Sequence, residues 1–275
     1  MLKSLKETSL AGLKVGSREY FAAQKQLILG RAPLKWCYDQ WYKLLLADAR
    51  SVPAKGALLE LGSGGSYLKD LEPAVITSDV VEGVAQKTVD ARKLPFTDNS
   101  IQAIFLTHVL HHIPQVDSFF REAERALVPG GVITMIEVAH TPFARFFFRR
   151  FHPEPYRDEL LEWSFEQNDS MMDSNQALSW MIFVRDRKKF EALHPQLQIV
   201  QFSRLPWFSY LLAGGVTGRC LVPKPANSIL PLAEKLLSPL SPIFSLHWHI
   251  CLRKRPQQDP SPLMASNYSD PVQAA

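Results

Sequence analysis

The chain has 275 residues, of which 46% are hydrophobic and 21% charged, and its formal net charge is +4. This is an ordinary globular composition, which excludes the disordered and collagen-like classes. The charge is modest and the aromatic residues are not interleaved with lysine and arginine, so we see no nucleic-acid-binding signature. A chain of this length can bury a full core, and we expect one large domain with additions.

Three cysteines, Cys37, Cys220 and Cys251, lie far apart in the sequence. Their odd number and spacing favour neither a disulfide framework nor a closely spaced zinc motif. Charged residues interrupt the leucines of residues 1–20, which is not the pattern of a signal peptide. The apolar stretches 207–216 and 229–246 are too short or too broken to span a bilayer. We therefore expect a cytoplasmic protein, either free or peripheral to the membrane, and leave its oligomeric state open.

Residues 1–55 are predicted to form an N-terminal helical cap. One apolar face follows helical spacing through Leu34, Cys37, Tyr38, Trp41 and Leu45. Packing against the next domain explains this face more simply than a role in substrate binding.

From residue 57 the sequence alternates buried strands with helices. Strands are predicted at 57–61, 75–79, 88–89, 101–107 and 132–138, with helices between them. Asp117 is a candidate cap for one helix, which Pro129-Gly130-Gly131 is expected to stop. Strands and helices that alternate in this way form right-handed crossovers and a parallel sheet.

After His140 the regular alternation of strands and helices ends. Residues 141–184 form an insertion, and the sheet is completed by 185–255, with a helix at 185–193 and strands at 197–202 and 245–253. A Pro/Leu-rich insertion at 205–242 carries one amphipathic helix near 230–237. Residues 256–275 are predicted to be a disordered tail.

The stretch 57–79 is the centre of this organisation. Glu60 leads into the turn Gly62-Ser63-Gly64-Gly65, and a second strand closes at Asp79. The dinucleotide fingerprint G-x-G-x-x-G fails because its last position falls on Tyr67, and no G-K-[ST] element follows. The ligand that remains is S-adenosylmethionine. An acid at the end of the second strand can accept hydrogen bonds from its ribose hydroxyls.

Several motifs occur in order: ELGSGG at 60–65, Asp79, Asp90-Ala91, LPF at 94–96, HVLHH at 108–112 and LVPGG at 127–131. Together they resemble the class I S-adenosylmethionine-dependent methyltransferases, in particular their type 11, small-molecule branch. The resemblance covers about residues 55–140. It implies a Rossmann-like, seven-stranded, mostly parallel sheet with an antiparallel last strand. One departure is Ser66, where many members have a third glycine.

The resemblance also implies a cofactor site. Glu60 would orient the turn or meet the ammonium group, the glycines would line methionine and ribose, and Asp79 would hold the ribose hydroxyls. His108 would sit beside the reactive methyl. The implied cofactor-binding residues are Glu60, Gly62, Ser63, Gly64, Gly65, Asp79, Val80, Asp90, Ala91 and His108. For Asp79 and Asp90, simple turn capping is the alternative.

Four histidines follow the fourth and fifth strands: His108, His111, His112 and His140. Methyl transfer from a sulfonium needs no metal, so we expect none, but a hydroxyl acceptor needs a base, for which histidine is suited. The resemblance implies packing for His111 and His112 and leaves His108 and His140 as candidate catalytic bases. His-x-x-His-His is also a possible metal trio. Glu137 is expected to be structural.

The insertion 141–184 is predicted to be a lid over the catalytic end. Its aromatic residues would line an apolar or sugar-stacking pocket or, equally, form a small accessory core: Phe143, Phe146, Phe147, Phe148, Phe151, Trp163, Phe165 and Trp180. Arginines beside phenylalanines also suit contact with a membrane surface. We therefore expect a methyltransferase acting on a small molecule, a lipid or an envelope saccharide. The alternative is a methyltransferase-like scaffold that binds without turnover.

Overall fold

The structure is a computed structural model that describes residues 7 and 9–256. The tail predicted for 256–275 lies outside the described residues, apart from Pro256. None of the helices in the described part of the chain is long and apolar enough to cross a membrane.

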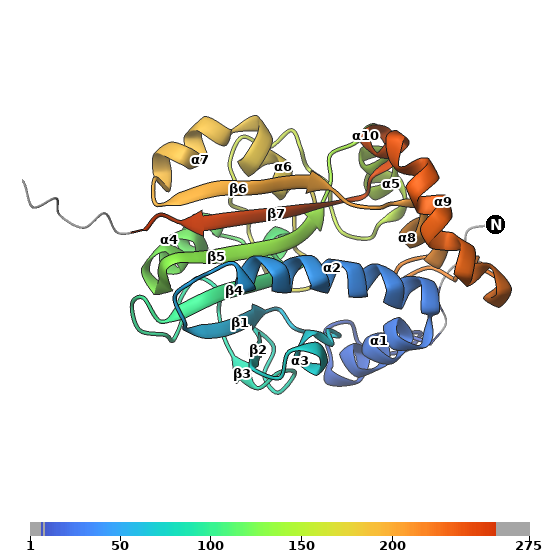
Figure 1. Ribbon diagram of the computed structural model, residues 1–275, viewed down its shortest axis with the longest axis horizontal. Coiled ribbons are helices and arrows are strands. Elements are labelled where there is room, and N and C mark those ends of the chain that lie inside the picture. The colour runs from blue at the N-terminus through green and yellow to red at the C-terminus, as the bar shows by residue number, and fades with distance from the viewer. Residues whose placement is uncertain (1–6, 8, 257–275) are drawn as a thin grey trace, which may run out of the picture.

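A seven-stranded sheet forms the centre of the molecule (Figure 1), with strand order β3-β2-β1-β4-β5-β7-β6. The first five strands are parallel, and β7 runs antiparallel to both β5 and β6. The predicted Rossmann-like, mostly parallel sheet with an antiparallel last strand is confirmed. The strands are β1 (Ala57–Leu61), β2 (Val75–Asp79), β3 (Lys87–Thr88), β4 (Ile101–Thr107), β5 (Leu127–Val138), β6 (Leu197–Arg204) and β7 (His247–Lys254).

One strand boundary differs clearly from the prediction. β5 begins at Leu127, so the Pro129-Gly130-Gly131 expected to stop the preceding helix lies inside the strand. Gly130 has φ +81°, and the pairing with β4 shifts register between Ile101 and Ala103. A glycine that tolerates positive φ therefore accommodates an irregularity in the strand.

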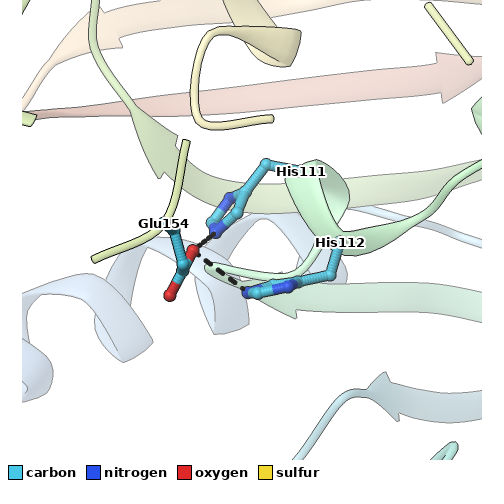
Figure 2. A group of neighbouring side chains, drawn as sticks. All are labelled: His111, His112 and Glu154. Atoms are coloured by element: carbon cyan, nitrogen blue, oxygen red, sulfur yellow. Dashed lines mark ion pairs between the residues drawn. The ribbon is translucent and has the colours of Figure 1, made fainter. Parts of the chain in front are cut away.

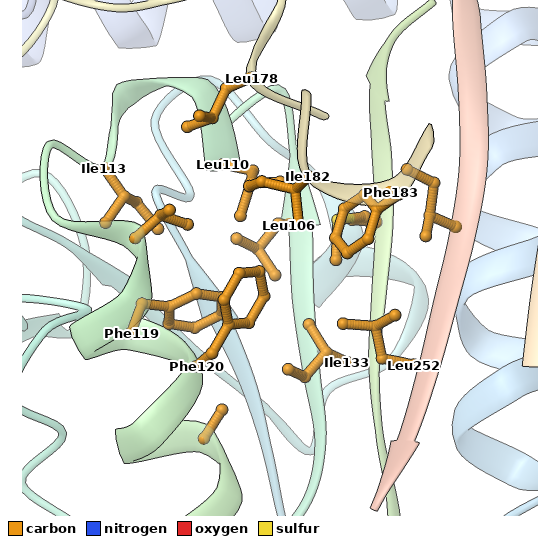
Figure 3. Close-up of a cluster of buried hydrophobic side chains, with 14 of the residues drawn as sticks. Leu106, Leu110, Ile113, Phe119, Phe120, Ile133, Leu178, Ile182, Phe183 and Leu252 are labelled. Carbon is orange, nitrogen blue, oxygen red and sulfur yellow. The ribbon is translucent and has the colours of Figure 1, made fainter. Parts of the chain in front are cut away.

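Alternation along β4 gives the sheet two buried faces. Ala103 and Phe105 face α2 (Ala32–Arg50), which follows α1 (Arg18–Gly30), whereas Ile104 and Leu106 face the opposite core. That core contains α4 (Val116–Ala126), and Figure 3 shows its phenylalanines packed beside Leu106. Because successive strand residues point to opposite faces, both layers of helices are held by the same strand.

Short elements surround this sheet, most of them from the second half of the chain. They are α3 (Leu68–Leu71) and the 3₁₀ turn η2 (Leu110–His112) in the first half, then α5 (Pro142–Phe151), α6 (Leu178–Trp180), the π-helical η3 (Met181–Arg185), α7 (Arg187–Leu193), α8 (Phe208–Ala213), η4 (Lys224–Ile229), α9 (Leu230–Leu237), η5 (Ser238–Leu240) and α10 (Ser241–Phe244). In Figure 1, α1, α8 and α9 gather at the end toward which β5 points. Open parallel sheets bind ligands at this carboxyl end.

Candidate functional site

The glycine turn between β1 and α3 is tightly enclosed by protein. Gly62 has φ +61°, and a Cβ added to it would lie 2.6 Å from a methyl group of Val109. Gly64 has φ +39°, and its added Cβ would lie 2.9 Å from the Phe21 ring of α1. Only glycine combines this backbone with this close approach. The N-terminal helix predicted as a cap therefore packs directly on the turn.

Asp79 ends β2 and is 5% exposed. Its Oδ2 accepts a hydrogen bond from the Gly64 amide at 3.2 Å, and its Oδ1 accepts one from the Val81 amide at 2.9 Å. Burial raises the pKa of this carboxyl, while the backbone N–H groups oppose the rise. Asp79 thus caps the turn and also lines the cavity described below, so the two predicted roles are compatible.

Glu60 lies at the end of β1 and is almost fully buried. Its Oε1 accepts a hydrogen bond of 2.6 Å from the Ser66 hydroxyl, and among the described residues its Oε2 has no partner. Burial raises the pKa of Glu60 from 4.5 to about 7, although the serine hydroxyls oppose the rise. Ser66 also accepts a hydrogen bond from the Leu68 amide at 3.0 Å. The residue that departs from the glycine pattern therefore orients Glu60 and starts α3.

Two adjoining cavities bring the predicted cofactor residues together. The larger, of about 450 Å³, is lined by Glu60, Gly62, Ser63, Gly64, Gly65, Asp79, Val80 and His108 among others. The smaller, of about 80 Å³, is lined by Asp90 and Ala91 and shares Val80 and Val109 with the larger. The Asp90 carboxylate is engaged by Arg92, whose Nη2 lies 2.7 Å from Oδ2. All ten predicted residues thus line one continuous region at the carboxyl end of the sheet.

His108 follows β4 in a left-handed backbone conformation, with φ +59°. Its ring packs edge-on against Trp41 and His247, with centroid distances of 5.5 and 4.7 Å. Its Nε2 is buried without a partner among the described residues. Burial lowers the pKa of His108 to about 4, so the ring is neutral near pH 7 and retains an acceptor nitrogen. A non-glycine residue in this conformation at a cavity wall is typical of a functional position.

His111 and His112 in η2 face Glu154, which comes from the segment after α5 (Figure 2). Both Nε2 atoms lie 3.5 Å from Glu154 Oε2. Burial alone would lower the pKa of His111, but the carboxylates of Glu137 and Glu154 outweigh it and raise the pKa to about 10. Burial and the neighbouring His111 lower the pKa of His112 to about 4. Both rings line the larger cavity, although the resemblance implied only packing for them.

Glu137, expected to be structural, has no exposed surface. It accepts hydrogen bonds from the amides of Val109 and Leu110 at 2.9 and 2.7 Å, and its other oxygen lies 2.7 Å from His111 Nδ1. These contacts fix the backbone of the loop that follows β4, and they orient the His111 ring.

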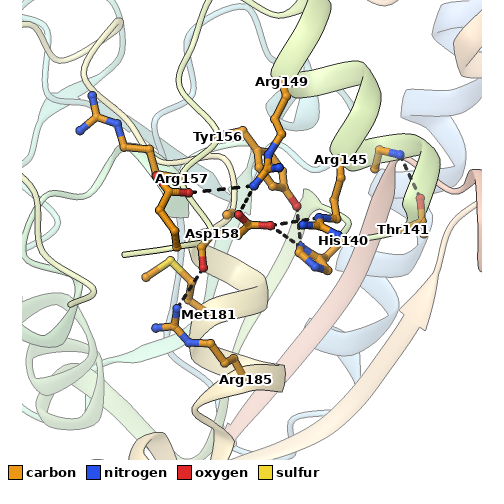
Figure 4. A network of polar contacts seen from close by, with 12 residues as sticks. His140, Thr141, Arg145, Arg149, Tyr156, Arg157, Asp158, Met181 and Arg185 are labelled. Atoms are coloured by element: carbon orange, nitrogen blue, oxygen red, sulfur yellow. Dashed lines mark hydrogen bonds and ion pairs between the residues drawn. The ribbon is translucent and has the colours of Figure 1, made fainter. Parts of the chain in front are cut away.

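His140, the other candidate base, lies in a different network (Figure 4). Its Nδ1 is 2.7 Å from the Tyr156 hydroxyl, and its ring stacks on Trp180 at 3.9 Å. Burial and the nearby Arg145 lower the pKa of His140 to about 4. It does not line either cavity, so the structure does not bring it together with the glycine turn.

The aromatic residues of the insertion mostly pack in or against the core that contains α4, whereas Phe146 and Phe151 are exposed. Of the eight considered in the sequence, Phe148 lines the larger cavity. The buried Trp163 instead donates a hydrogen bond to Asp186, and Phe165 packs against the main core. The insertion reaches the cavity mainly through polar and sulfur-containing side chains.

Sequence reasoning missed several residues of the cavity wall. They are Tyr20, Phe21, Tyr38, Tyr42, His152, Glu154, Met171, Gln176, Tyr210 and His247. Of these residues, only His247 could have been found from the sequence. The first residue of an antiparallel strand lies beside the last residue of its neighbour, and His247 pairs with Val138 at the end of β5.

Comparison with known proteins supports the resemblance seen in the sequence. Residues 59–135 match the family described as "Methyltransferase domain". The chain is 27% identical over 136 residues to the ubiquinone/menaquinone biosynthesis C-methyltransferase UbiE of Desulfotalea psychrophila, covering 40% of this chain and 55% of that protein. It is 24% identical over 128 residues to the demethylmenaquinone methyltransferase of Lactobacillus johnsonii, covering 46% and 52%. The chain spans about half the length, or less, of the curated relatives it matches.

Solved structures show only distant similarity. The chain is similar to YcgJ of Bacillus subtilis, at 18% identity and a TM-score of 0.47, covering 80% of this chain and 100% of that one. It is also similar to a chain of the Haloferax volcanii complex between the Trm112 methyltransferase activator and the putative methyltransferase, at 13% identity and a TM-score of 0.48, covering 87% and 96%. The resemblance to S-adenosylmethionine-dependent methyltransferases is confirmed by the family match over the core of the chain.

Proposed function

We propose that this protein is an S-adenosylmethionine-dependent methyltransferase that acts on a small, largely apolar molecule. The observation that carries the proposal is the buried Glu60 carboxylate, whose Oε2 has no partner among the described residues and lies on the same cavity as the glycine turn. A buried charged oxygen without a partner is costly, so its natural complement is a cation. The ammonium group of S-adenosylmethionine is such a cation.

The rest of the donor set fits the same cofactor. Asp79 offers carboxylate lone pairs beside the turn, where ribose hydroxyls can donate to them. Asp90 and Ala91 line the smaller cavity next door, which is suited to a flat ring. When bound, the cofactor supplies an electrophilic methyl group on a sulfonium. The protein then contributes alignment and the exclusion of water.

His108 is our candidate for the group that accepts a proton from the acceptor. Its neutral imidazole and unpartnered Nε2 meet the requirement for a base at the cavity wall. His140 has no comparable support, because it lies in the Tyr156 and Asp158 network outside the cavities.

The acceptor is expected to be apolar or aromatic rather than a saccharide. The part of the cavity wall supplied by α1, α2, α5, the segment after α5, and α8 is rich in aromatic and sulfur-containing side chains: Tyr20, Phe21, Tyr38, Phe148, Met171 and Tyr210. Such walls bind flat or apolar groups. The relatives named as a ubiquinone/menaquinone biosynthesis C-methyltransferase and a demethylmenaquinone methyltransferase agree with an acceptor of this class. In this proposal residues 56–140 bind the cofactor and the insertion 141–184 contributes to the acceptor side.

A ridge of exposed apolar residues supports delivery of the acceptor from a membrane surface. Ile229, Leu232 and Leu236 on and before α9 are 60%, 61% and 70% exposed, and Leu240 and Ile243 continue the row. Helical spacing places such residues on one side, and an exposed Lys235 lies on the same helix. In Figure 1, α9 lies at the same end of the molecule as α1 and α8, which supply part of the cavity wall.

Two experiments test the proposal. The first incubates the protein with methyl-labelled S-adenosylmethionine and fractionated cell extract; we expect label in the apolar small-molecule fraction. Calorimetric titration with S-adenosylhomocysteine measures cofactor affinity independently. No binding would overturn the proposal, and binding without transfer to any fraction would favour the scaffold alternative.

The second experiment measures co-sedimentation with anionic phospholipid vesicles. The double variant L232E/L236E is expected to lose binding, whereas Leu161→Glu, at a side chain that is 82% exposed, is the matched control. Equal sedimentation of both variants would contradict membrane contact through the ridge.

A further inference from the structure

The cluster of His111, His112 and Glu154 places two imidazole nitrogens beside one carboxylate oxygen, which also accepts hydrogen bonds from the Gln176 side-chain amide and the Ser174 hydroxyl. Each Nε2 lies 3.5 Å from the same oxygen, Glu154 Oε2, which is longer than a normal N–H···O hydrogen bond. The three ligand atoms all lie within 4.8 Å of one another. Ligands held about 2.0–2.2 Å from a tetrahedral ion are about 3.3–3.6 Å apart, so the two 3.5 Å spacings between the imidazole nitrogens and Glu154 match edges of such a coordination shell.

The surroundings of His111 have the form found around metal-binding histidines. Its Nδ1 is held at 2.7 Å by the buried Glu137 carboxylate, which leaves Nε2 directed toward Glu154. Metal-ligating histidines generally use their second ring nitrogen in this way, because the carboxylate fixes the ring and strengthens the ligand. Glu137 therefore serves as a positioning residue for His111.

Two further observations favour a cation at this point. Neither Glu137 nor Glu154 forms an ion pair with lysine or arginine in the described part of the chain, so histidines are the only potentially cationic side chains paired with these two carboxylates there. The side-chain oxygen of Gln176, on the same wall, is buried without a partner among residues that the structure describes. An amide oxygen is an acceptable additional ligand for a divalent cation.

We propose that His111, His112 and Glu154 bind one divalent transition-metal ion of the zinc or iron(II) class. Two imidazoles and one carboxylate are the donor set of open catalytic zinc sites and of non-haem iron sites. All three ligands line the larger cavity, so the remaining coordination positions face the acceptor space. The ion would hold an oxygen of the acceptor there, and this role rests on the proposed methyltransferase function. The proposal departs from the sequence expectation that no metal is needed.

The test is a cobalt titration of the full chain after removal of any affinity tag and of bound metal with a chelator. Co²⁺ is followed by its visible absorption, Zn²⁺ by competition, and stoichiometry by elemental analysis. We expect one ion per chain. His112→Ala and Glu154→Gln are each expected to weaken binding about 100-fold or more, because each removes a ligand. Circular dichroism checks that both variants fold. His140→Asn, a histidine outside the cavities, is the matched control and should bind normally.

The outcomes separate this proposal from the previous one. Absence of stoichiometric Co²⁺ binding to the folded protein would overturn the metal site, as would equal binding by His112→Ala, Glu154→Gln and the control. Titration of the metal-free protein with S-adenosylhomocysteine is independent of the ion. Metal binding without cofactor binding would support the metal site and overturn the methyltransferase proposal. Cofactor binding without metal binding would support the methyltransferase proposal and overturn the metal site.

Discussion

The two ends of the larger cavity are built in different ways. The end assigned to the cofactor comes chiefly from one continuous stretch, since Glu60, the glycine turn and Asp79 lie within twenty residues and belong to β1, β2 and the connection between them. The end assigned to the acceptor combines side chains from α1, η2, the segment after α5, α8 and β7. A site made from one supersecondary unit leaves a pattern in the sequence, whereas a site assembled across the fold does not.

The separation between the ends is not complete. Phe21 and Gln24 of α1 pack where Cβ atoms on Gly64 and Gly65 would lie, so the cofactor end also depends on a distant helix. His108 stands where the ends meet, because it follows β4 and contacts His247 at the start of β7. Changes at or near this boundary can show whether the two ends work separately.

The largest expected effect comes from His108→Asn. Asparagine tolerates the left-handed backbone of this position, so the change removes the imidazole while retaining the turn. Once an acceptor has been found, we expect kcat to fall about 100-fold or more, as for loss of a general base. Affinity for S-adenosylhomocysteine should stay within about twofold. A similar loss of cofactor affinity would show that the two ends are coupled at His108.

Asp79→Ala is expected to act on the cofactor end alone. It removes the acceptor of the Gly64 and Val81 amides as well as the proposed ribose contact. Hydrogen bonds to charged groups contribute about 1.5–3 kcal/mol each, so the dissociation constant for S-adenosylhomocysteine should rise about 10- to 100-fold. Calorimetry measures it, with Asp98→Ala as the control, because the Asp98 side chain is 71% exposed. Unchanged affinity in Asp79→Ala would contradict the site assignment.

Glu60→Gln tests the charge at the same end through its pH dependence. The pKa of Glu60 is raised by burial to about 7, so without ligand the carboxyl ionises only as the pH rises toward and past neutrality. Its raised pKa means that its contribution to the free energy of unfolding is greatest below about pH 4.5 and is lost as the pH rises through about 7. A cationic ligand favours the carboxylate, so S-adenosylmethionine should bind more tightly at pH 8 than at pH 6.

In Glu60→Gln this dependence should vanish, and affinity at pH 8 should be about tenfold weaker than in the wild type. The carboxyl is replaced by an amide of nearly equal size, so the variant keeps the shape of the cavity and removes only the charge. Binding by the wild type that does not change between pH 6 and pH 8 would remove Glu60 as the partner of the ammonium group.

The sequence was sufficient to predict a mostly parallel, Rossmann-like sheet with an antiparallel last strand and the position of the glycine turn, because the alternation of strands and helices and the order of the motifs are visible along the chain. It misplaced the start of β5, where Gly130 continues the strand through an irregularity. It could not place Glu154 opposite His111, because their meeting depends on how the segment after α5 folds back over η2. It also could not exclude His140 from the cavity, since a residue just beyond a strand can turn to either side.

The smallest expected effect, and the sharpest separation of the two ends, comes from Glu234→Gln. Glu234 in α9 is 5% exposed, and its oxygens accept hydrogen bonds from the amides of Trp207 and Ser209, both at 2.7 Å, at the start of α8. An amide retains only one acceptor oxygen, so one amide loses its charged partner, at a cost of about 1–3 kcal/mol. Because α8 carries Tyr210, this loosens the acceptor wall and leaves the glycine turn untouched.

We therefore expect Glu234→Gln to lower the free energy of unfolding by about 1–3 kcal/mol and to speed proteolysis within residues 205–244. The dissociation constant for S-adenosylhomocysteine should change less than about twofold, because distant sites behave additively. Glu162→Gln is the matched control, since that side chain is 74% exposed and its ion pair with Lys189 is loose at 3.7 Å. If cofactor affinity fell together with stability in Glu234→Gln, the acceptor wall would be part of the same cooperative unit as the glycine turn, and the two ends could not be varied independently.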